Sequence, residues 1–112
     1  MITPAVTVLM AVYNGERYVG SAIESVLSQC FHSFELLVVD DGSTDGTGGL
    51  IKSYTDPRIR LERNSTNIGL TPSLNRGLKL AKGQYLARID ADDICEPGRL
   101  ERQVAYLDAN PD

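Results

Sequence analysis

Five aspartates in two short clusters are the residues of this sequence best suited to chemistry. Asp40 and Asp41 are adjacent, and Asp90, Asp92 and Asp93 are three acids within four residues. Carboxylate oxygens bind hard cations such as Mg²⁺ and Mn²⁺, and Mg²⁺ usually keeps water and substrate phosphate as its other ligands. The clusters therefore predict a Mg²⁺ or Mn²⁺ site for a phosphate-bearing ligand. The alternative is that aspartates simply favour the turns that follow strands.

Each acid cluster comes directly after a stretch with the pattern of a strand. Residues 34–39, apolar except for Glu35, precede the first cluster, and residues 85–89 precede the second. Residues 6–12 form a further apolar, β-branched run, typical of a strand that is buried on both faces. The alternating residues 58–63 predict an edge strand. Helices are expected over 16–30, 44–54, 71–82 and 97–109, with Thr71 as N-cap of the third helix, Leu74, Leu78 and Ala81 as its buried stripe and Gly83 at its end.

The expected order of elements is an alternation of strand and helix. Such an order predicts a parallel sheet with right-handed crossovers. The carboxyl ends of parallel strands meet at one edge of the sheet, where ligands of open α/β folds bind. Both acid clusters should therefore share one crevice. Carboxylates this close repel each other unless a cation lies between them.

The ordered motifs of the chain resemble the amino-terminal segment of family 2 glycosyltransferases. The resemblance implies an α/β, Rossmann-like GT-A fold, with a mostly parallel sheet of about four strands and helices on both faces. It implies that residues 1–112 are a nucleotide-diphospho-sugar-binding domain, truncated before the acceptor-binding half. The matching stretches are VLMAVYN (8–14), SVLSQ (25–29), ELLVVDDGSTD (35–45), N-x-G (67–69), LNRG (74–77) and ARIDADD (87–93).

The resemblance also implies roles for individual residues. Asp41 is expected to accept a hydrogen bond from the uracil of a UDP-sugar. Asp90-Ala91-Asp92 with Asp93 resembles the family's Asp-x-Asp motif, in which Asp92 and Asp93 divide ribose contact and coordination of Mn²⁺ or Mg²⁺. The remaining donor-binding residues are expected to be Ala11, Val12, Tyr13, Asn14, Glu16, Asn67 and Gly69.

The implied activity is inverting transfer of a hexose to a saccharide or lipid-linked acceptor in bacterial polysaccharide synthesis. The general base of the family lies beyond the position of Asp112, so residues 1–112 alone are expected to bind the donor without transferring sugar. We expect a cytoplasmic domain, and the inner face of the membrane is the alternative location for the full-length enzyme. The strand over 84–89 is expected to have an open edge, through which a homodimer could form.

Other function classes fit the sequence less well. The formal net charge of −4 argues against nucleic-acid binding, and the single histidine, His32, excludes a histidine-based metal site. Cys30 and Cys95 lack metal-site spacing and are expected to be reduced thiols. A phosphoacceptor receiver domain would carry acids after the first strand, where this chain has Tyr13 and Asn14. A non-catalytic assembly module with the same fold is the second alternative.

Overall fold

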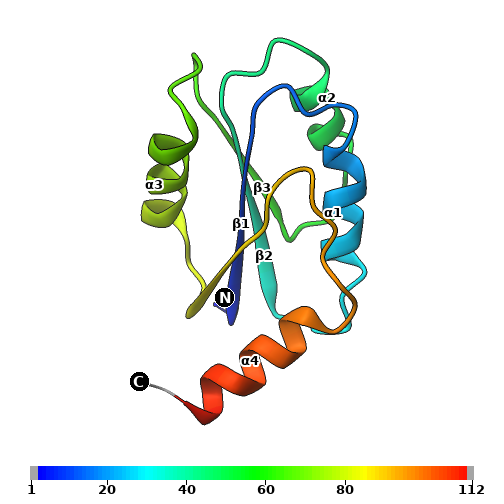
Figure 1. Ribbon diagram of the computed structural model, residues 1–112, viewed down its shortest axis with the longest axis vertical. Coiled ribbons are helices and arrows are strands. Elements are labelled where there is room, and N and C mark those ends of the chain that lie inside the picture. The colour runs from blue at the N-terminus through cyan, green and yellow to red at the C-terminus, as the bar shows by residue number, and fades with distance from the viewer. Residues whose placement is uncertain (1–2, 111–112) are drawn as a thin grey trace.

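The structure, a computed structural model, describes residues 3–110 and contains a four-stranded parallel sheet (Figure 1). The strands lie in the order β3-β2-β1-β4, so β1 and β2 are central. The predicted alternation of strand and helix is confirmed. The elements are β1 (Val6–Val12), α1 (Val19–Leu27), β2 (Phe34–Asp40), α2 (Thr47–Lys52), β3 (Ile59–Arg63), α3 (Leu70–Leu80), β4 (Tyr85–Arg88) and α4 (Arg99–Ala109).

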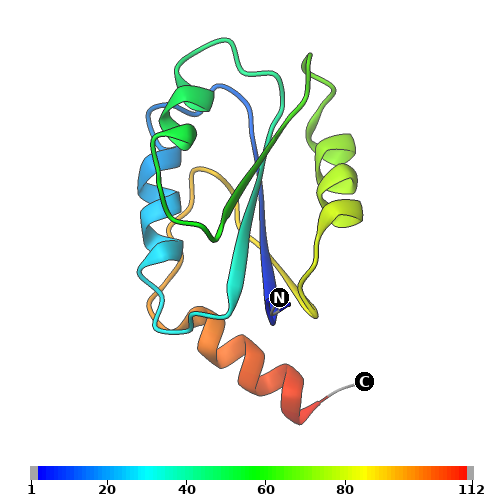
Figure 2. The ribbon, with the colours of Figure 1, turned by 180° about the vertical axis from the view of Figure 1, so that it is seen from behind.

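Helices cover both faces of the sheet, as expected (Figures 1 and 2). Successive side chains of a strand point to opposite faces. Val8 and Met10 of β1 therefore belong to the core beside α1, whereas Leu9 between them packs toward Leu74 of α3. Every residue of β2 is buried, and full burial of one large aliphatic side chain contributes about 1.5–3 kcal/mol. The two central strands thus anchor both layers of helices.

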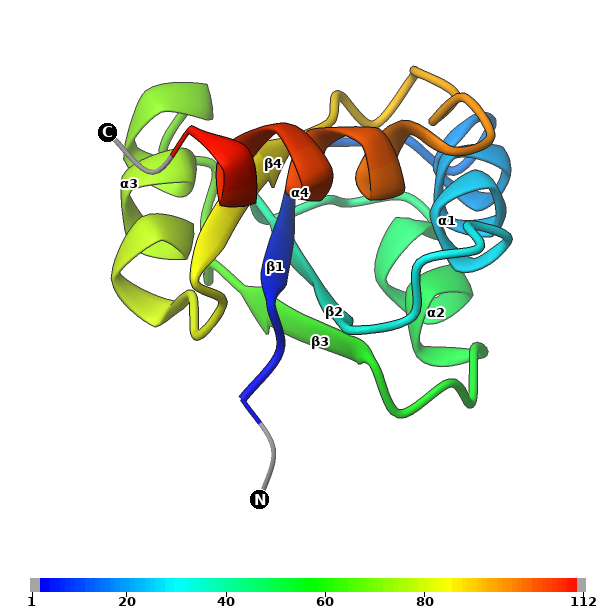
Figure 3. The same ribbon diagram turned by 90° about the horizontal axis from the view of Figure 1, so that it is seen from below.

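Helix α4 crosses the end of the sheet at which the strands begin (Figure 3). Leu100 and Val104 belong to the core cluster beside α1, and the hydroxyl of Tyr85 in β4 donates to Asp108 at 2.6 Å. Both cysteines are free; Cys95 is buried in this core and Cys30 is exposed. None of the helices in the described part of the chain is long and apolar enough to cross a membrane.

The boundaries of α3 differ from those expected. The helix begins at Leu70 and is capped by Gly69, so Thr71 is not its N-cap. Gly69 has a φ of 102°, a conformation that favours glycine, and its carbonyl accepts the amide of Ser73 at 3.2 Å. The helix ends at Leu80, before Gly83, because the amide of Gly83 instead donates to the Thr7 hydroxyl in β1 at 2.8 Å.

The buried stripe of α3 also differs from the expected one. Ser73 and Gly77 are buried, while Leu78 is 50% exposed. A Cβ at Gly77 would lie 2.3 Å from Cδ1 of Leu9. Close approach of α3 to β1 therefore requires a glycine at this position. Leu74 of the expected stripe does pack against Leu9, but it is only partly buried, and the buried positions of the helix are the small residues.

The other three helices are shorter than their patterns predicted. α1 spans Val19–Leu27 rather than 16–30. α2 has six residues rather than the eleven over 44–54, and the carboxylate of Asp45 accepts the amide of its first residue, Thr47, at 2.9 Å. α4 begins at Arg99 rather than at Pro97, because Gly98 adopts a left-handed conformation with φ 78°.

A buried carboxylate, Glu35 of β2, joins four parts of the fold. It accepts the Thr7 hydroxyl of β1, the backbone amide of Lys82 at 2.7 Å and the Arg60 guanidinium of β3 at 2.7 Å. Burial raises the pKa of Glu35, but these hydrogen bonds and the charge of Arg60 outweigh burial and leave the pKa below its usual value. The ionised form of Glu35 therefore stabilises the connection that follows α3.

We predict that Glu35→Ala lowers the free energy of unfolding by roughly 2–3 kcal/mol, because it leaves the Lys82 amide without its acceptor and Arg60 without its carboxylate partner, with only the Leu80 carbonyl as acceptor. Because the folded-state pKa of Glu35 lies below its unfolded value, its contribution is complete above the unfolded pKa. It is lost as the pH falls through the folded-state pKa. Melting temperatures between about pH 7 and about pH 3 measure both effects.

Glu101, which is exposed on α4, supplies the matched control. Glu35→Gln should flatten the acid limb of the stability profile, whereas Glu101→Gln should change it little. Identical profiles for the two variants would show that Glu35 does not carry this dependence.

Candidate active site

The loops after the strands gather at one edge of the sheet and enclose a pocket (Figure 1). Its volume is about 140 Å³. Six of the ten residues predicted to bind the donor line it, from the end of β1, the end of β2 and the loop before α3. The lining residues are Ala11, Val12, Tyr13, Asp41, Asn67, Gly69, Leu70 and Ser73.

The carboxylate of Asp41 lines this pocket and accepts hydrogen bonds from four residues of the chain. Its Oδ1 accepts the amide of Ile68 at 2.8 Å and the side chain of Asn64 at 2.9 Å. Its Oδ2 accepts the amide of Gly69 at 2.9 Å and the side chain of Asn67 at 3.1 Å. Burial raises the pKa of Asp41, but the donated hydrogen bonds outweigh it and hold the pKa below its usual value. Asp41 is therefore an anion that organises the loop before α3.

A side-chain network behind Asp41 centres on Asn64, a residue that the sequence did not single out. The side-chain amide of Asn64 also donates to the Ser73 hydroxyl at 3.0 Å, and its oxygen accepts Arg76 of α3 at 2.6 Å. Arg76 in turn donates to Glu62 at 3.2 Å. Asn64 is buried, although it lies in a polar stretch that reads as loop. The LNRG motif, which contains Arg76, is the only sequence signal for this brace.

Asp40 does not belong to the pocket, which corrects the expectation that both acids after β2 enter one crevice. Alternation along the strand directs Asp40 to the opposite face from Asp41. There it is fully buried beside Gly48 of α2, with one oxygen accepting the amide of Ser43 at 3.0 Å. The other oxygen lies 3.7 Å from Nε of Arg63 and accepts no hydrogen bond.

Asn14 and Glu16 lie beside the pocket rather than in its lining, and they hold two loops together. The side-chain oxygen of Asn14 accepts the backbone amides of Thr44 and Asp45, at 2.8 and 3.3 Å. Asn14 has a positive φ of 50°, and its own amide donates to the Ser43 hydroxyl at 2.9 Å. The carboxylate of Glu16 accepts the amide of Gly46 at 3.1 Å. Asn14 and Glu16 thus bind backbone amides of the loop after β2.

The second acid cluster forms an exposed turn after β4. The amide of Ile89 donates to Leu9 of β1 at 3.0 Å, and the amide of Asp93 donates to the carbonyl of Asp90 at 3.0 Å. Ala91 is buried between exposed acids. Arg88 lies 3.3 Å from Asp90 in an exposed ion pair, whereas Asp92 and Asp93 have no ion-pair partner among residues 3–110.

The structure provides no complete protein cage for a metal. Within residues 3–110, no three acid, histidine or cysteine side chains are grouped so that they could hold an ion. The expected sharing of five carboxylates is therefore wrong. Two adjacent exposed acids, Asp92 and Asp93, still fit Mg²⁺ or Mn²⁺, since such ions commonly use one or two protein carboxylates and take substrate phosphate as a further ligand.

The walls of the pocket suit a flat heterocycle. Tyr13 and Leu70 are 46% and 54% exposed and line the pocket. Its polar side chains are those of Asp41, Asn67 and Ser73. Apolar sides with a few fixed polar groups are the usual character of a small-molecule site.

Comparison with known proteins identifies the family. Residues 7–112 match the sequence profile described as "Glycosyl transferase family 2". The chain belongs to this family. It is 48% identical to the putative glycosyltransferase EpsE of Bacillus subtilis, over 94% of this chain and 39% of that protein. The chain thus spans about two fifths of that relative. Family membership removes the receiver-domain alternative.

Solved structures of glycosyltransferases share the fold. TarS of S. aureus in complex with UDP-GlcNAc superposes with a TM-score of 0.88 at 30% identity, covering 93% of this chain and 31% of that one. A mannosyltransferase from Pyrobaculum calidifontis in complex with GDP-Man and Mn²⁺ gives 0.85 at 27% identity, covering 96% and 33%. The GT-A expectation is confirmed.

We predict that Asp41→Asn loosens the loop before α3. The substitution removes the charge, which weakens both bonds, and puts an NH2 group in place of one carboxylate oxygen, opposite the amide of either Ile68 or Gly69. A hydrogen bond to a charged group contributes about 1.5–3 kcal/mol, so amide exchange at these two residues should accelerate by about tenfold or more. Hydrogen-exchange NMR measures it.

Asp92→Asn is the matched control, because Asp92 is exposed and lies in the turn after β4. It should leave exchange at Ile68 and Gly69 unchanged. Equal exchange rates in wild type and Asp41→Asn would contradict the organising role of Asp41.

Proposed function

We propose that this domain binds the nucleotide-sugar donor of a glycosyltransferase, with UDP as the nucleotide and Mn²⁺ or Mg²⁺ at the diphosphate. The observation that carries the proposal is the division of acids along one sheet edge. Asp41 lies in a pocket with apolar walls, and Asp92 and Asp93 remain exposed and unpaired in the turn after β4. The base of a nucleotide-sugar suits the pocket with apolar walls, and its ribose and metal-bound diphosphate suit the exposed acids.

The structural relatives support this division. TarS has been solved in complex with UDP-GlcNAc, and the mannosyltransferase in complex with GDP-Man and Mn²⁺. Both relatives thus bind a nucleotide-sugar, while the base differs between them. The choice of UDP for this chain rests on the small pocket and on Asp41, which suits the N–H of a pyrimidine ring.

Base recognition by Asp41 involves an exchange of donors. All four hydrogen bonds to its carboxylate come from within the chain, and the bond from the Asn67 side chain, at 3.1 Å, is the longest. Ile68 and Gly69 donate from the backbone, whereas Asn67 is exposed and donates from a side chain. We propose that the ring N–H of uracil takes the place of the Asn67 amide, with Tyr13 and Leu70 against the faces of the ring.

The acids after β4 serve the other end of the donor. Asp92 and Asp93 would hold the divalent ion, or one of them would contact the ribose with Asp90. The ion supplies Lewis-acid stabilisation for the negative charge of the departing diphosphate. In transfer, an acceptor hydroxyl oxygen bonds to the anomeric carbon as the carbon–oxygen bond to diphosphate breaks. The bonding electrons stay on the diphosphate, and a base takes the hydroxyl proton.

We predict that Mn²⁺ tightens UDP binding by about tenfold or more and that Asp92→Asn and Asp93→Asn each remove most of this effect. Calorimetry with and without Mn²⁺ measures it. Both variants should melt in EDTA at the wild-type temperature or slightly above, because each removes one charge from a repelling cluster. Glu101→Gln is the control and should bind as wild type does.

Two results would count against this assignment. Equal UDP affinity with and without Mn²⁺ in the wild-type protein would remove the metal, and would favour an assembly module. Tighter binding of GDP or dTDP than of UDP would overturn the base assignment to Asp41.

We also propose that residues 1–112 bind the donor but transfer sugar slowly by themselves. The support is that they span about two fifths of EpsE. General-base catalysis contributes about 10²- to 10⁴-fold, and positioning of the acceptor can contribute about 7–11 kcal/mol. UDP release from a panel of UDP-sugars with Mn²⁺ should therefore be near background with or without simple saccharide acceptors. Rapid acceptor-dependent release would contradict this.

Self-association through the outer edge of β4 stays a prediction.

A further inference from the structure

The SVLSQ motif at the end of α1 contacts the segment that follows the acidic turn. Ser25 and Gln29, the first and last residues of this motif, are about seventy positions from their partners in the sequence. The Ser25 hydroxyl accepts the backbone amide of Cys95 at 2.8 Å. The Gln29 side chain donates to the carbonyl of Glu96 at 2.9 Å and, more weakly, to that of Cys95 at 3.4 Å.

Gln29 also caps α4. Its side-chain oxygen accepts the amide of Leu100, in the first turn of that helix, at 3.2 Å. The amides of a first turn have no partner within their own helix, and Gly98, the N-cap, has no side chain that could accept one. Gln29 is only 2% exposed, so its side chain makes these hydrogen bonds to Cys95, Glu96 and Leu100 without competition from water.

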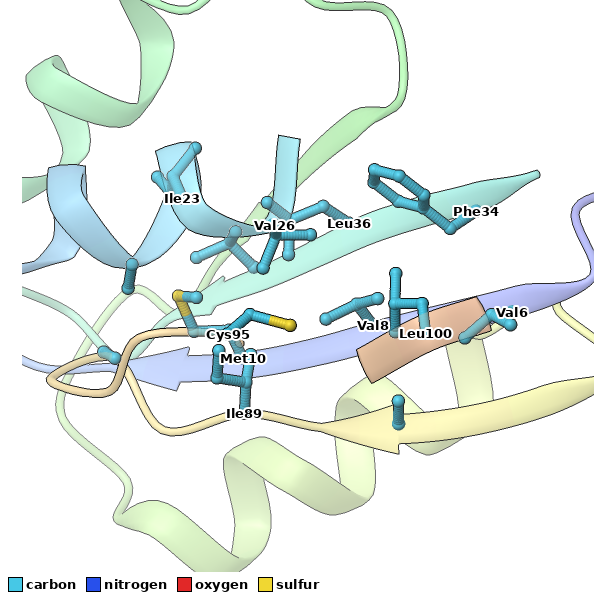
Figure 4. Close-up of a cluster of buried hydrophobic side chains, with 14 of the residues drawn as sticks. Val6, Val8, Met10, Ile23, Val26, Phe34, Leu36, Ile89, Cys95 and Leu100 are labelled. Atoms are coloured by element: carbon cyan, nitrogen blue, oxygen red, sulfur yellow. The ribbon is translucent and has the colours of Figure 1, made fainter. Parts of the chain in front are cut away.

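The acidic turn is consequently held at both ends. At one end the amide of Ile89 donates to Leu9 of β1, and at the other Cys95 is tied to Ser25. Ile89 and Cys95 are each 3% exposed and lie beside Met10 in the core (Figure 4). Between these anchors, the exposed acids are constrained by the bond from the Asp93 amide to the Asp90 carbonyl, the burial of Ala91 and the exposed ion pair of Asp90 with Arg88.

We propose that Ser25 and Gln29 are positioning residues for Asp92 and Asp93, and therefore for the metal and diphosphate end of the donor. The inference rests on the proposed function for the identity of the ligand. The pocket with Asp41 lies on the α3 face and has no contact with the motif among its lining residues. The motif should thus influence the metal-dependent part of binding and leave the base pocket unchanged.

Ser25 offers a sharp set of variants. Ser25→Ala removes the acceptor of the Cys95 amide, whereas Ser25→Thr retains a hydroxyl. Ser28→Ala is the matched control, since the Ser28 hydroxyl donates to the Glu24 carbonyl within the same helix end and is exposed. Gln29→Ala removes the second tie and the cap of α4.

The first readout is amide exchange by NMR, which needs no ligand. We expect Ser25→Ala and Gln29→Ala each to accelerate amide exchange at Asp93 by about tenfold. Ser25→Ala should also accelerate exchange at Cys95 by about tenfold, and Gln29→Ala should do so at Leu100, because each variant removes the acceptor of that amide. Exchange at Ile89, on the β1 side, should remain unchanged. Ser25→Thr and Ser28→Ala should resemble wild type. Wild-type exchange at Asp93 in both Ser25→Ala and Gln29→Ala would overturn the proposal.

The second readout is the affinity for UDP with and without Mn²⁺. We expect Ser25→Ala and Gln29→Ala to keep metal-free affinity within about twofold and to lose about fivefold or more of the Mn²⁺ effect, with Ser25→Thr restoring it. A general loss of stability would lower both affinities together. Variants that keep the full Mn²⁺ effect would overturn the proposal. A wild-type protein without any Mn²⁺ effect would instead contradict the proposed function, and the exchange data would still decide whether the turn is held from α1.

Discussion

Pairing of β1 between β2 and β4 is the constraint on which the site depends. It brings the ends of three strands to one edge, and strand alternation then assigns consecutive side chains to opposite faces. Asp40 and Asp41 are neighbours in sequence, yet one is buried against α2 and the other lines the pocket on the α3 face. A shift of one residue in the register of β2 would exchange their roles, so the register of this strand determines which acid lines the pocket.

The acids of this edge avoid mutual repulsion by having different partners. Asp40 is near Arg63, and Asp41 is surrounded by four donors, two of them backbone amides. Preorganised dipoles stabilise an anion without adding a second full charge, so Asp41 can remain ionised beside a ligand that is itself negatively charged. Asp92 and Asp93 have no such partners among residues 3–110, and an unneutralised pair is best matched by a divalent cation.

The sequence predicted the alternation of elements because buried strands and amphipathic helices have distinct periods. It also predicted six of the residues that line the pocket, because they follow strands that must end at one edge. It failed where side chains act on distant backbone. Gly69 caps α3 because the loop turns back to Asp41, and Arg76 braces that loop through Asn64. Such contacts depend on tertiary geometry, and local propensity gave α3 a cap at Thr71 instead.

The two ends of the candidate site rest on different layers of the molecule. The loop of the base pocket is braced by α3, and the acidic turn is tied to the end of α1 on the opposite face. The two central strands connect them: Leu9 of β1 packs toward α3 and accepts the amide of Ile89, and β2 contributes side chains to the cores on both faces. A donor that spans both ends would therefore add a further link between the loop braced by α3 and the turn tied to α1. Because a ligand stabilises only the states that bind it, such a donor would favour conformations in which both layers are in place. Flexibility of the acidic turn would then lower affinity in proportion to the time it spends outside its binding geometry, and the contacts of Ser25 and Gln29 reduce that time before the donor arrives.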